Sequence, residues 1–142
     1  MRLMLERAFV LAIAVAVIGC GKPPHQLVPI SGKVTYNGRP LKFGCVKFQP
    51  ETGQWSKGII QPDGTFQMVT PDEGDGAAVG VNKVRISCFE NQDPTKKNGS
   101  EEMGIVLGRS LIPRKYASQD TSGLKVEVKA EGNGPVIFDL KD

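Results

Sequence analysis

Apolar and polar residues alternate along most of the chain after residue 29, and this period of two is what most limits its fold. Successive side chains of a strand point to opposite faces of a sheet, so the alternation predicts strands with one buried face. It recurs in six short stretches: 30–36, 45–49, 65–70, 82–88, 124–129 and 136–140. A seventh stretch, 55–61, is also expected to be a strand, but the adjacent Ile59 and Ile60 leave its buried face open. After residue 19 no stretch repeats its apolar residues with a helical period, so an all-β fold is expected.

Turn residues separate these stretches at nearly regular spacing. Asn37–Gly38 is the strongest short hairpin signal, because both residues adopt positive φ at little cost. Pro62-Asp63-Gly64 has the chemistry of a tight turn. The 17 glycines and 10 prolines are also typical of many short strands joined by turns. Together these features predict an antiparallel β-sandwich.

The inward-facing apolar residues of the seven stretches form the expected core. Each contributes roughly 1.5–3 kcal/mol when fully buried, so the set can offset the chain entropy of one domain without a disulfide. The expected core is Ile30, Val34, Tyr36, Val46, Phe48, Phe66, Met68, Val84, Ile86, Leu124, Val126, Val128, Phe138 and Leu140.

The first residues have the pattern of a secretory signal. Arg2 and Arg7 precede an unbroken apolar run over 8–18, and the chain turns polar after Cys20. As a helix this run is ~16 Å long, about half of a hydrocarbon core, and therefore too short to span a membrane. A signal-peptide helix is expected over 1–19.

The residues at the end of that run resemble the lipobox of bacterial lipoproteins. Val17-Ile18-Gly19-Cys20 places a cysteine directly after a small residue. The resemblance implies cleavage between Gly19 and Cys20 and acylation of Cys20 with fatty acids such as palmitate. The alternative is an ordinary signal peptide with a cysteine nearby. Because Gly21 is not Asp, the lipoprotein sorting rule favours the outer membrane or cell surface over the inner membrane.

The mature chain divides into a short tether and one domain. Residues 20–29 contain three prolines and few apolar residues, and predict a stiff tether. Residues 30–142 are long enough for one domain. The net charge of +3 is too small to indicate a nucleic-acid partner. The expected location is extracytoplasmic, with the membrane contacted through the lipid.

Several runs inside the domain resemble the carboxypeptidase-regulatory-like or transthyretin-like family. The shared pattern is a strand over 31–36, a turn ending in Pro40–Leu41, a second strand over 46–48, and the hairpin motif Asp-Gly-x-Phe at 63–66. The run 112–140 is similar to small bacterial lipoproteins built on this domain. The resemblance covers about 30–142 and implies a seven-stranded antiparallel Greek-key β-sandwich of prealbumin-like type. It implies almost nothing about function.

The residue types argue against catalysis. A metal-dependent protease needs several His and acidic ligands, and this chain has only His25. A Ser or Cys nucleophile needs a positioned base, which no other histidine can supply. We therefore expect no catalytic site, no metal and no cofactor.

Three residues remain as weaker candidates. Cys45 and Cys88 can form a disulfide in an exported protein, but the alternation places them on opposite faces of their strands. Trp55 is the aromatic to test for exposure and for ligand binding. The leading hypothesis is a non-catalytic module that binds a protein or envelope material at the membrane, and the alternative is a carbohydrate-binding accessory module. An exposed Trp55 in a polar groove favours the second, and an exposed apolar patch favours a protein partner.

Overall fold

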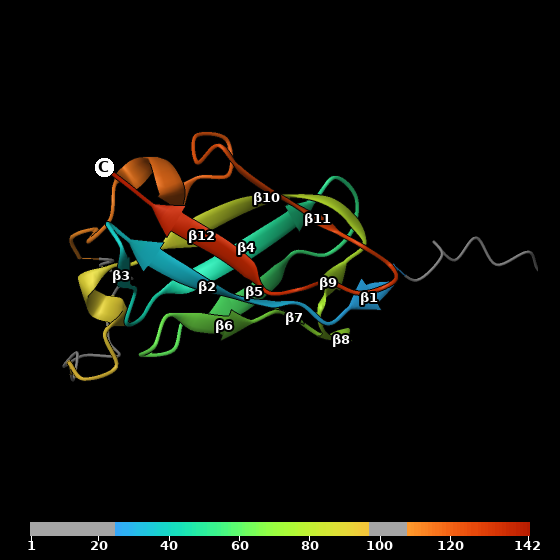
Figure 1. The fold of residues 1–142 in the computed structure, drawn as a ribbon, viewed down its shortest axis with the longest axis horizontal. Coiled ribbons are helices and arrows are strands. Elements are labelled where there is room, and N and C mark those ends of the chain that lie inside the picture. Colours follow the sequence, from blue (N-terminus) through green and yellow to red (C-terminus); the bar gives the residue numbers. More distant parts are fainter. Residues whose placement is uncertain (1–24, 97–107) are drawn as a thin grey trace, which may run out of the picture.

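The computed structural model describes residues 25–96 and 108–142. The expected signal peptide, the cleavage site at Gly19 and the lipidation site at Cys20 lie outside the described residues. Within the described part the chain is almost entirely β, as the alternation predicts (Figure 1).

The described residues form twelve strands and two short 3-10 helices. Every predicted stretch overlaps at least one strand, and the strands outside these stretches are two residues long. The strands are β1 (Leu27–Val28), β2 (Ser31–Tyr36), β3 (Arg39–Pro40), β4 (Cys45–Pro50), β5 (Ser56–Ile59), β6 (Thr65–Gln67), β7 (Val69–Thr70), β8 (Gly74–Asp75), β9 (Ala77–Ala78), β10 (Gly80–Ser87), β11 (Leu124–Val128) and β12 (Val136–Leu140). The helices are η1 (Glu90–Gln92) and η2 (Arg114–Ala117).

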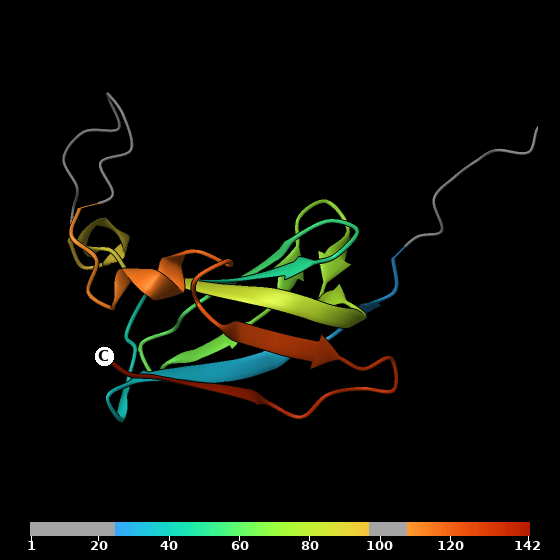
Figure 2. The same ribbon diagram turned by 90° about the horizontal axis from the view of Figure 1, so that it is seen from above.

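Two sheets lie one above the other (Figure 2). The larger has the strand order β11-β10-β4-β5-β7-β8. The smaller has the order β12-β2-β3, and β6 also pairs with β2. A separate two-stranded ladder joins β1 to β9. Because Leu27 and Val28 pair with Ala78 and Ala77, the folded body begins before residue 30, where the sequence placed its boundary.

One strand pair corrects the expected antiparallel arrangement. β2 and β12 run parallel, with Val34 opposite Phe138. The connection over 129–135 carries the chain from β11 in the larger sheet to β12 in the smaller one. This crossing brings β12 to the free edge of β2 in the same direction. Alternation reveals which face of a strand is buried but not its neighbour, so the sequence missed the parallel pair.

The predicted strand over 65–70 is divided between the two sheets. β6 pairs with β2 in the smaller sheet, whereas β7 pairs with β5 in the larger one. Met68, between them, is buried, and its N–H donates to the carbonyl oxygen of Ile30 at 3.0 Å. The alternation continues through this change, which is why the sequence shows one strand here.

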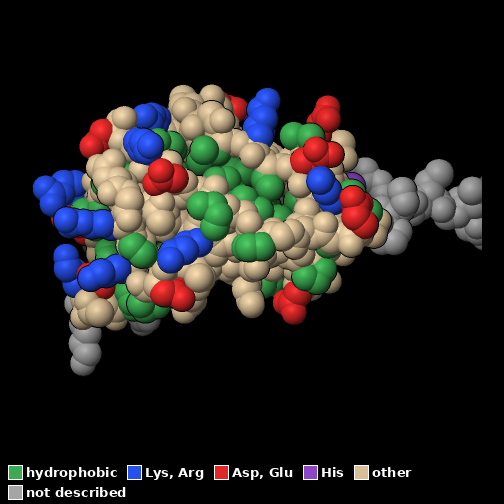
Figure 3. Space-filling view, in the orientation of Figure 1, with side chains coloured by type: hydrophobic (Ala, Val, Ile, Leu, Met, Phe, Trp, Pro, Cys, Tyr) green, Lys and Arg blue, Asp and Glu red, His purple; other side chains and the backbone are tan. Residues whose placement is uncertain are grey.

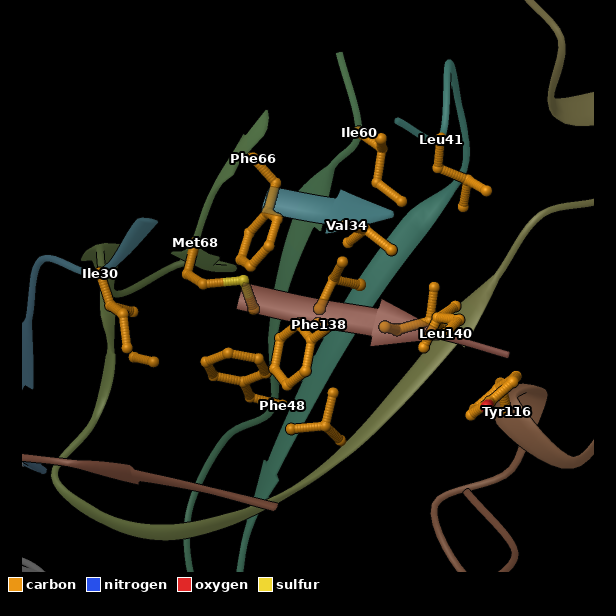
Figure 4. Close-up of a cluster of buried hydrophobic side chains, with 14 of the residues drawn as sticks. Ile30, Val34, Leu41, Phe48, Ile60, Phe66, Met68, Tyr116, Phe138 and Leu140 are labelled. Carbon is orange, nitrogen blue, oxygen red and sulfur yellow. The ribbon is translucent and has the colours of Figure 1, made fainter. Parts of the chain in front are cut away.

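Three phenylalanine rings form the centre of the core (Figure 4). Phe48 of the larger sheet meets Phe66 and Phe138 of the smaller sheet edge to face, with ring centroids 6.4 and 6.2 Å apart. Eleven expected core residues are buried, and Tyr36, Leu124 and Val126 are partly buried against them. Additional core residues are Val28, Leu41, Ile60, Ala77, Cys88, Ile112 and Tyr116.

Candidate functional site

Trp55 lies on the outer face of the larger sheet, directly before β5. Ser56 points inward, so Trp55 and Lys57 on either side of it point outward. The indole is half-buried, and the Nζ atom of Lys47 lies 4.5 Å from its ring centroid. Such a cation–π contact contributes about 0.5–1 kcal/mol at an exposed site and holds the ammonium over the ring.

A hollow of about 150 Å³ opens beside the indole ring. Its wall combines the aromatic ring with two amides and two cations. The lining residues are Lys47, Phe48, Gln49, Trp55, Arg85 and Gln119. The hollow is smaller than the ~300–1,000 Å³ of a typical small-ligand pocket, but its wall combines an apolar ring with polar groups as such pockets do.

Lys47 and Arg85 belong to a row of positive charge that crosses three strands. Arg85 of β10 pairs directly with Lys47 of β4, and Lys47 pairs directly with Lys57 of β5. Cys45 lies beside this row. Burial raises the pKa of the Cys45 thiol, while the charges of Lys47, Lys57 and Arg85 act in the opposite direction.

A larger groove, about 820 Å³, begins at Lys57 and extends to the smaller sheet. Ile59, Val69 and Ile137 line it and are 56%, 39% and 61% exposed. Lys33 lines it from β2. Figure 3 shows hydrophobic side chains gathered over the middle of the face on which β12 and β2 lie in front. The groove thus joins exposed apolar side chains to two lysines.

The remaining perturbed carboxyl and tyrosine groups owe their shifts to local hydrogen bonds. The Tyr36 hydroxyl donates to Asp142, which raises the pKa of Tyr36 and lowers the pKa of Asp142. The hydroxyl and backbone N–H of Thr65 donate to Asp63, which lowers the pKa of that carboxyl. A similar local pair lowers the pKa of Asp93 beside Thr95. In the part of the chain that the structure describes, no group of three or more His, Cys, Asp or Glu side chains is placed to hold a metal ion.

Cys45 and Cys88 are free thiols on opposite faces of the larger sheet. Cys45 is half-buried on the outer face, whereas Cys88 is buried in the core. Burial, followed by the charge of Asp93, raises the pKa of Cys88 from 9.0 to about 11.

We expect Cys88 to resist alkylation at pH 8–10 in the folded protein and to react once urea unfolds the chain. The folded state holds this proton more tightly than the unfolded state, so its contribution to stability is lost as the pH rises from about 9 towards 11. Mass spectrometry after timed iodoacetamide treatment measures the labelling. In a Cys20→Ala chain, a mass gain of two hydrogens on reduction alone would instead reveal a Cys45–Cys88 disulfide.

Comparisons of the chain with family models, curated proteins and solved structures found no match. The resemblance to the carboxypeptidase-regulatory-like family therefore remains a prediction from the motifs. Among the described residues, no helix has the length and apolar character needed to cross a membrane.

The sequence identified Trp55 but missed the cations and amides around it. Lys47, Arg85 and Lys57 occupy outward positions of predicted strands, which ordinarily indicates only a solvated face. Their juxtaposition depends on strand order and register. A run of like charges at outward positions of several strands was the available signal, and it becomes informative only once the strands are aligned.

Proposed function

We propose that this chain is a non-catalytic binding module, held outside a membrane by lipid on Cys20, that binds polysaccharide of the cell envelope. The observation that carries the proposal is the hollow at Trp55, where an aromatic surface meets the Gln49 and Gln119 amides and two cations. Amides suit the hydroxyl groups of a sugar, and an indole suits its apolar face.

The proposed fold is the Greek-key sandwich of the carboxypeptidase-regulatory-like family. Its support is the match between the seven predicted stretches and the strands β2, β4, β5, β6 with β7, β10, β11 and β12. The antiparallel pairing of β10 with β4, and of β4 with β5, brings Arg85, Lys47 and Trp55 together at the hollow. On this proposal the fold supplies a rigid sheet, and the outer face supplies the binding site.

Substitution of Trp55 tests the binding function. We expect Trp55→Ala to weaken cosedimentation of the purified full chain with isolated envelope polysaccharide by tenfold or more, because it removes the ring and frees Lys47. Val81→Ala is the control, since Val81 is 58% exposed on the same sheet outside the hollow. Equal binding by the wild type and Trp55→Ala would contradict the proposal.

Substitution of Cys20 tests the anchor. When cells are fed labelled fatty acid, we expect wild type to carry acyl mass and to fractionate with membranes. Cys20→Ala should lose both properties, because the proposed acyl attachment needs the thiol. Intact-mass analysis measures the acyl groups. An unchanged acyl mass in the variant would end the anchor proposal and leave the binding proposal standing.

A protein partner is the second candidate function. The exposed Ile59, Val69 and Ile137 in the large groove favour it, because monomeric proteins usually keep such clusters small. On this alternative, Ile137→Asp would abolish partner binding. It would leave cosedimentation with polysaccharide unchanged, since Ile137 does not line the hollow at Trp55.

A further inference from the structure

The cation row, formed by Arg85, Lys47 and Lys57, places three like charges side by side, which is electrostatically unfavourable. Arg85, Lys47 and Lys57 lie directly opposite one another on three adjacent strands, and like charges in such cross-strand pairs are destabilising. With strands about 4.8 Å apart, the row spans about 10 Å.

No carboxylate of the described residues neutralises a cation of the row. Among residues 25–96 and 108–142, none of these three cations forms an ion pair with a carboxylate. Lys83, on the same strand and face as Arg85, does have a partner, since its Nζ lies 3.6 Å from Asp120. Lys83 therefore has a carboxylate beside it, whereas the three cations of the row have none at ion-pair distance among the described residues, and the row stays positive.

The middle cation of the row is also held in place. The Trp55 ring holds the Lys47 ammonium at 4.5 Å from its centroid, so this side chain loses less freedom when an anion binds. Arg85, in the same hollow, offers a planar fork that matches the geometry of a carboxylate or sulfate. Lys57 continues the row into the large groove, where Lys33 lies.

We infer that the row binds an acidic polysaccharide, a chain of sugars bearing carboxylate or sulfate groups. This inference rests on the proposed function and names its ligand class. The charges extend over about 10 Å, which suits a chain with repeated anionic groups better than a single small anion. Single-stranded nucleic acid is disfavoured, because its binding sites stack successive bases on several aromatic rings. Of the two aromatic residues described in the lining of the hollow, Phe48 is fully buried, which leaves Trp55 alone for stacking.

The experiment uses Trp55 as its own reporter, since it is the only tryptophan of the chain. The purified full chain in detergent is titrated with dextran sulfate, polygalacturonate, neutral dextran and single-stranded DNA, and the indole emission is recorded. We expect both acidic polysaccharides to bind, neutral dextran to bind at least tenfold more weakly, and affinity to fall steeply with added salt.

The variants Lys47→Gln, Lys57→Gln and Arg85→Gln test the row itself. Each should weaken dextran sulfate binding about tenfold and lower the slope of log affinity against log salt by about one. Lys129→Gln is the matched control: it removes the same charge from an exposed residue after β11 and should change affinity less than twofold. Thermal unfolding of each variant checks that the fold is retained.

The outcomes separate the two proposals. Binding of neutral dextran as tight as that of dextran sulfate would overturn the acidic ligand while keeping a polysaccharide-binding function. Binding of none of the three polysaccharides would overturn the inference; if envelope polysaccharide also fails to bind, the proposed function fails with it. Equal losses in Lys129→Gln and the row variants, or tighter binding of DNA than of either acidic polysaccharide, would also overturn the inference.

Discussion

Replacing Gly32 with valine is expected to lower the free energy of unfolding by about 3 kcal/mol or more, the upper end of what overpacking costs. A Cβ at this position would overlap the carbonyl oxygen of Val136 and lie 2.7 Å from Cζ of Phe66. The first obstacle is backbone of the partner strand, and the second is a ring fully enclosed in the core. Neither can yield without opening the β2–β12 ladder or displacing the aromatic cluster.

Urea unfolding followed by circular dichroism measures this change, and Gly134→Val is the matched control. Gly134 also lacks a positive φ, and nothing lies within 4 Å of the position its Cβ would take. The same added side chain should therefore cost little there. If both variants unfolded at the same urea concentration, the close approach of β2, β6 and β12 at Gly32 would be refuted.

Replacing Phe48 with alanine is expected to cost about 3–5 kcal/mol, the range for deleting a buried aromatic ring. Phe48 is fully buried and contacts the rings of Phe66 and Phe138 across the two sheets. Its loss would remove burial and also the edge-to-face contacts, each contributing about 0.5–1.5 kcal/mol beyond area. A domain is stable by about 5–15 kcal/mol, so this one substitution would remove a large share of its free energy of unfolding.

Val81→Ala provides the control for this loss, because Val81 is an exposed apolar residue on the same sheet. It should change the midpoint of urea unfolding by little, whereas Phe48→Ala should lower that midpoint strongly. A Phe48→Ala protein as stable as Val81→Ala would show that the two sheets do not depend on this contact.

The sequence predicted which residues are buried more reliably than which strands are neighbours. Phe66, Val84 and Phe138 were expected inward and are buried, because burial follows from alternation within a single strand. Pairing is a property of two strands, and neither the residues of β2 nor those of β12 indicate that these two strands are neighbours. The parallel ladder and the division of 65–70 between two sheets therefore emerged only from the structure.

The same difference explains Tyr116, which the sequence left out of the core. It lies in the short helix η2, where no strand period exists to mark it as buried. Its hydroxyl donates to the carbonyl oxygen of Lys141 at 2.9 Å and accepts from the Lys141 N–H at 3.1 Å. A single turn of helix thus holds the chain just after β12, through a contact that spans 25 residues of sequence.

The candidate site depended even more on register. Trp55 was identified because it is a lone large aromatic beside a turn, a property of one residue. Lys47 and Arg85 became informative only when the β10–β4 register placed them opposite each other. Sites assembled across strands are therefore harder to predict from sequence than the strands themselves.

The pairing of β2 with β12 also determines when the smaller sheet can form during synthesis of the chain. Thr35 and Asp139, whose side chains hydrogen bond across this pair, are 104 residues apart in the chain. At ~5–20 residues per second, synthesis separates the two strands by several seconds or more. Throughout that interval one edge of β2 lacks its partner, and an unpaired edge is a template for the wrong strand. The smaller sheet is therefore completed only after β12 has been synthesised.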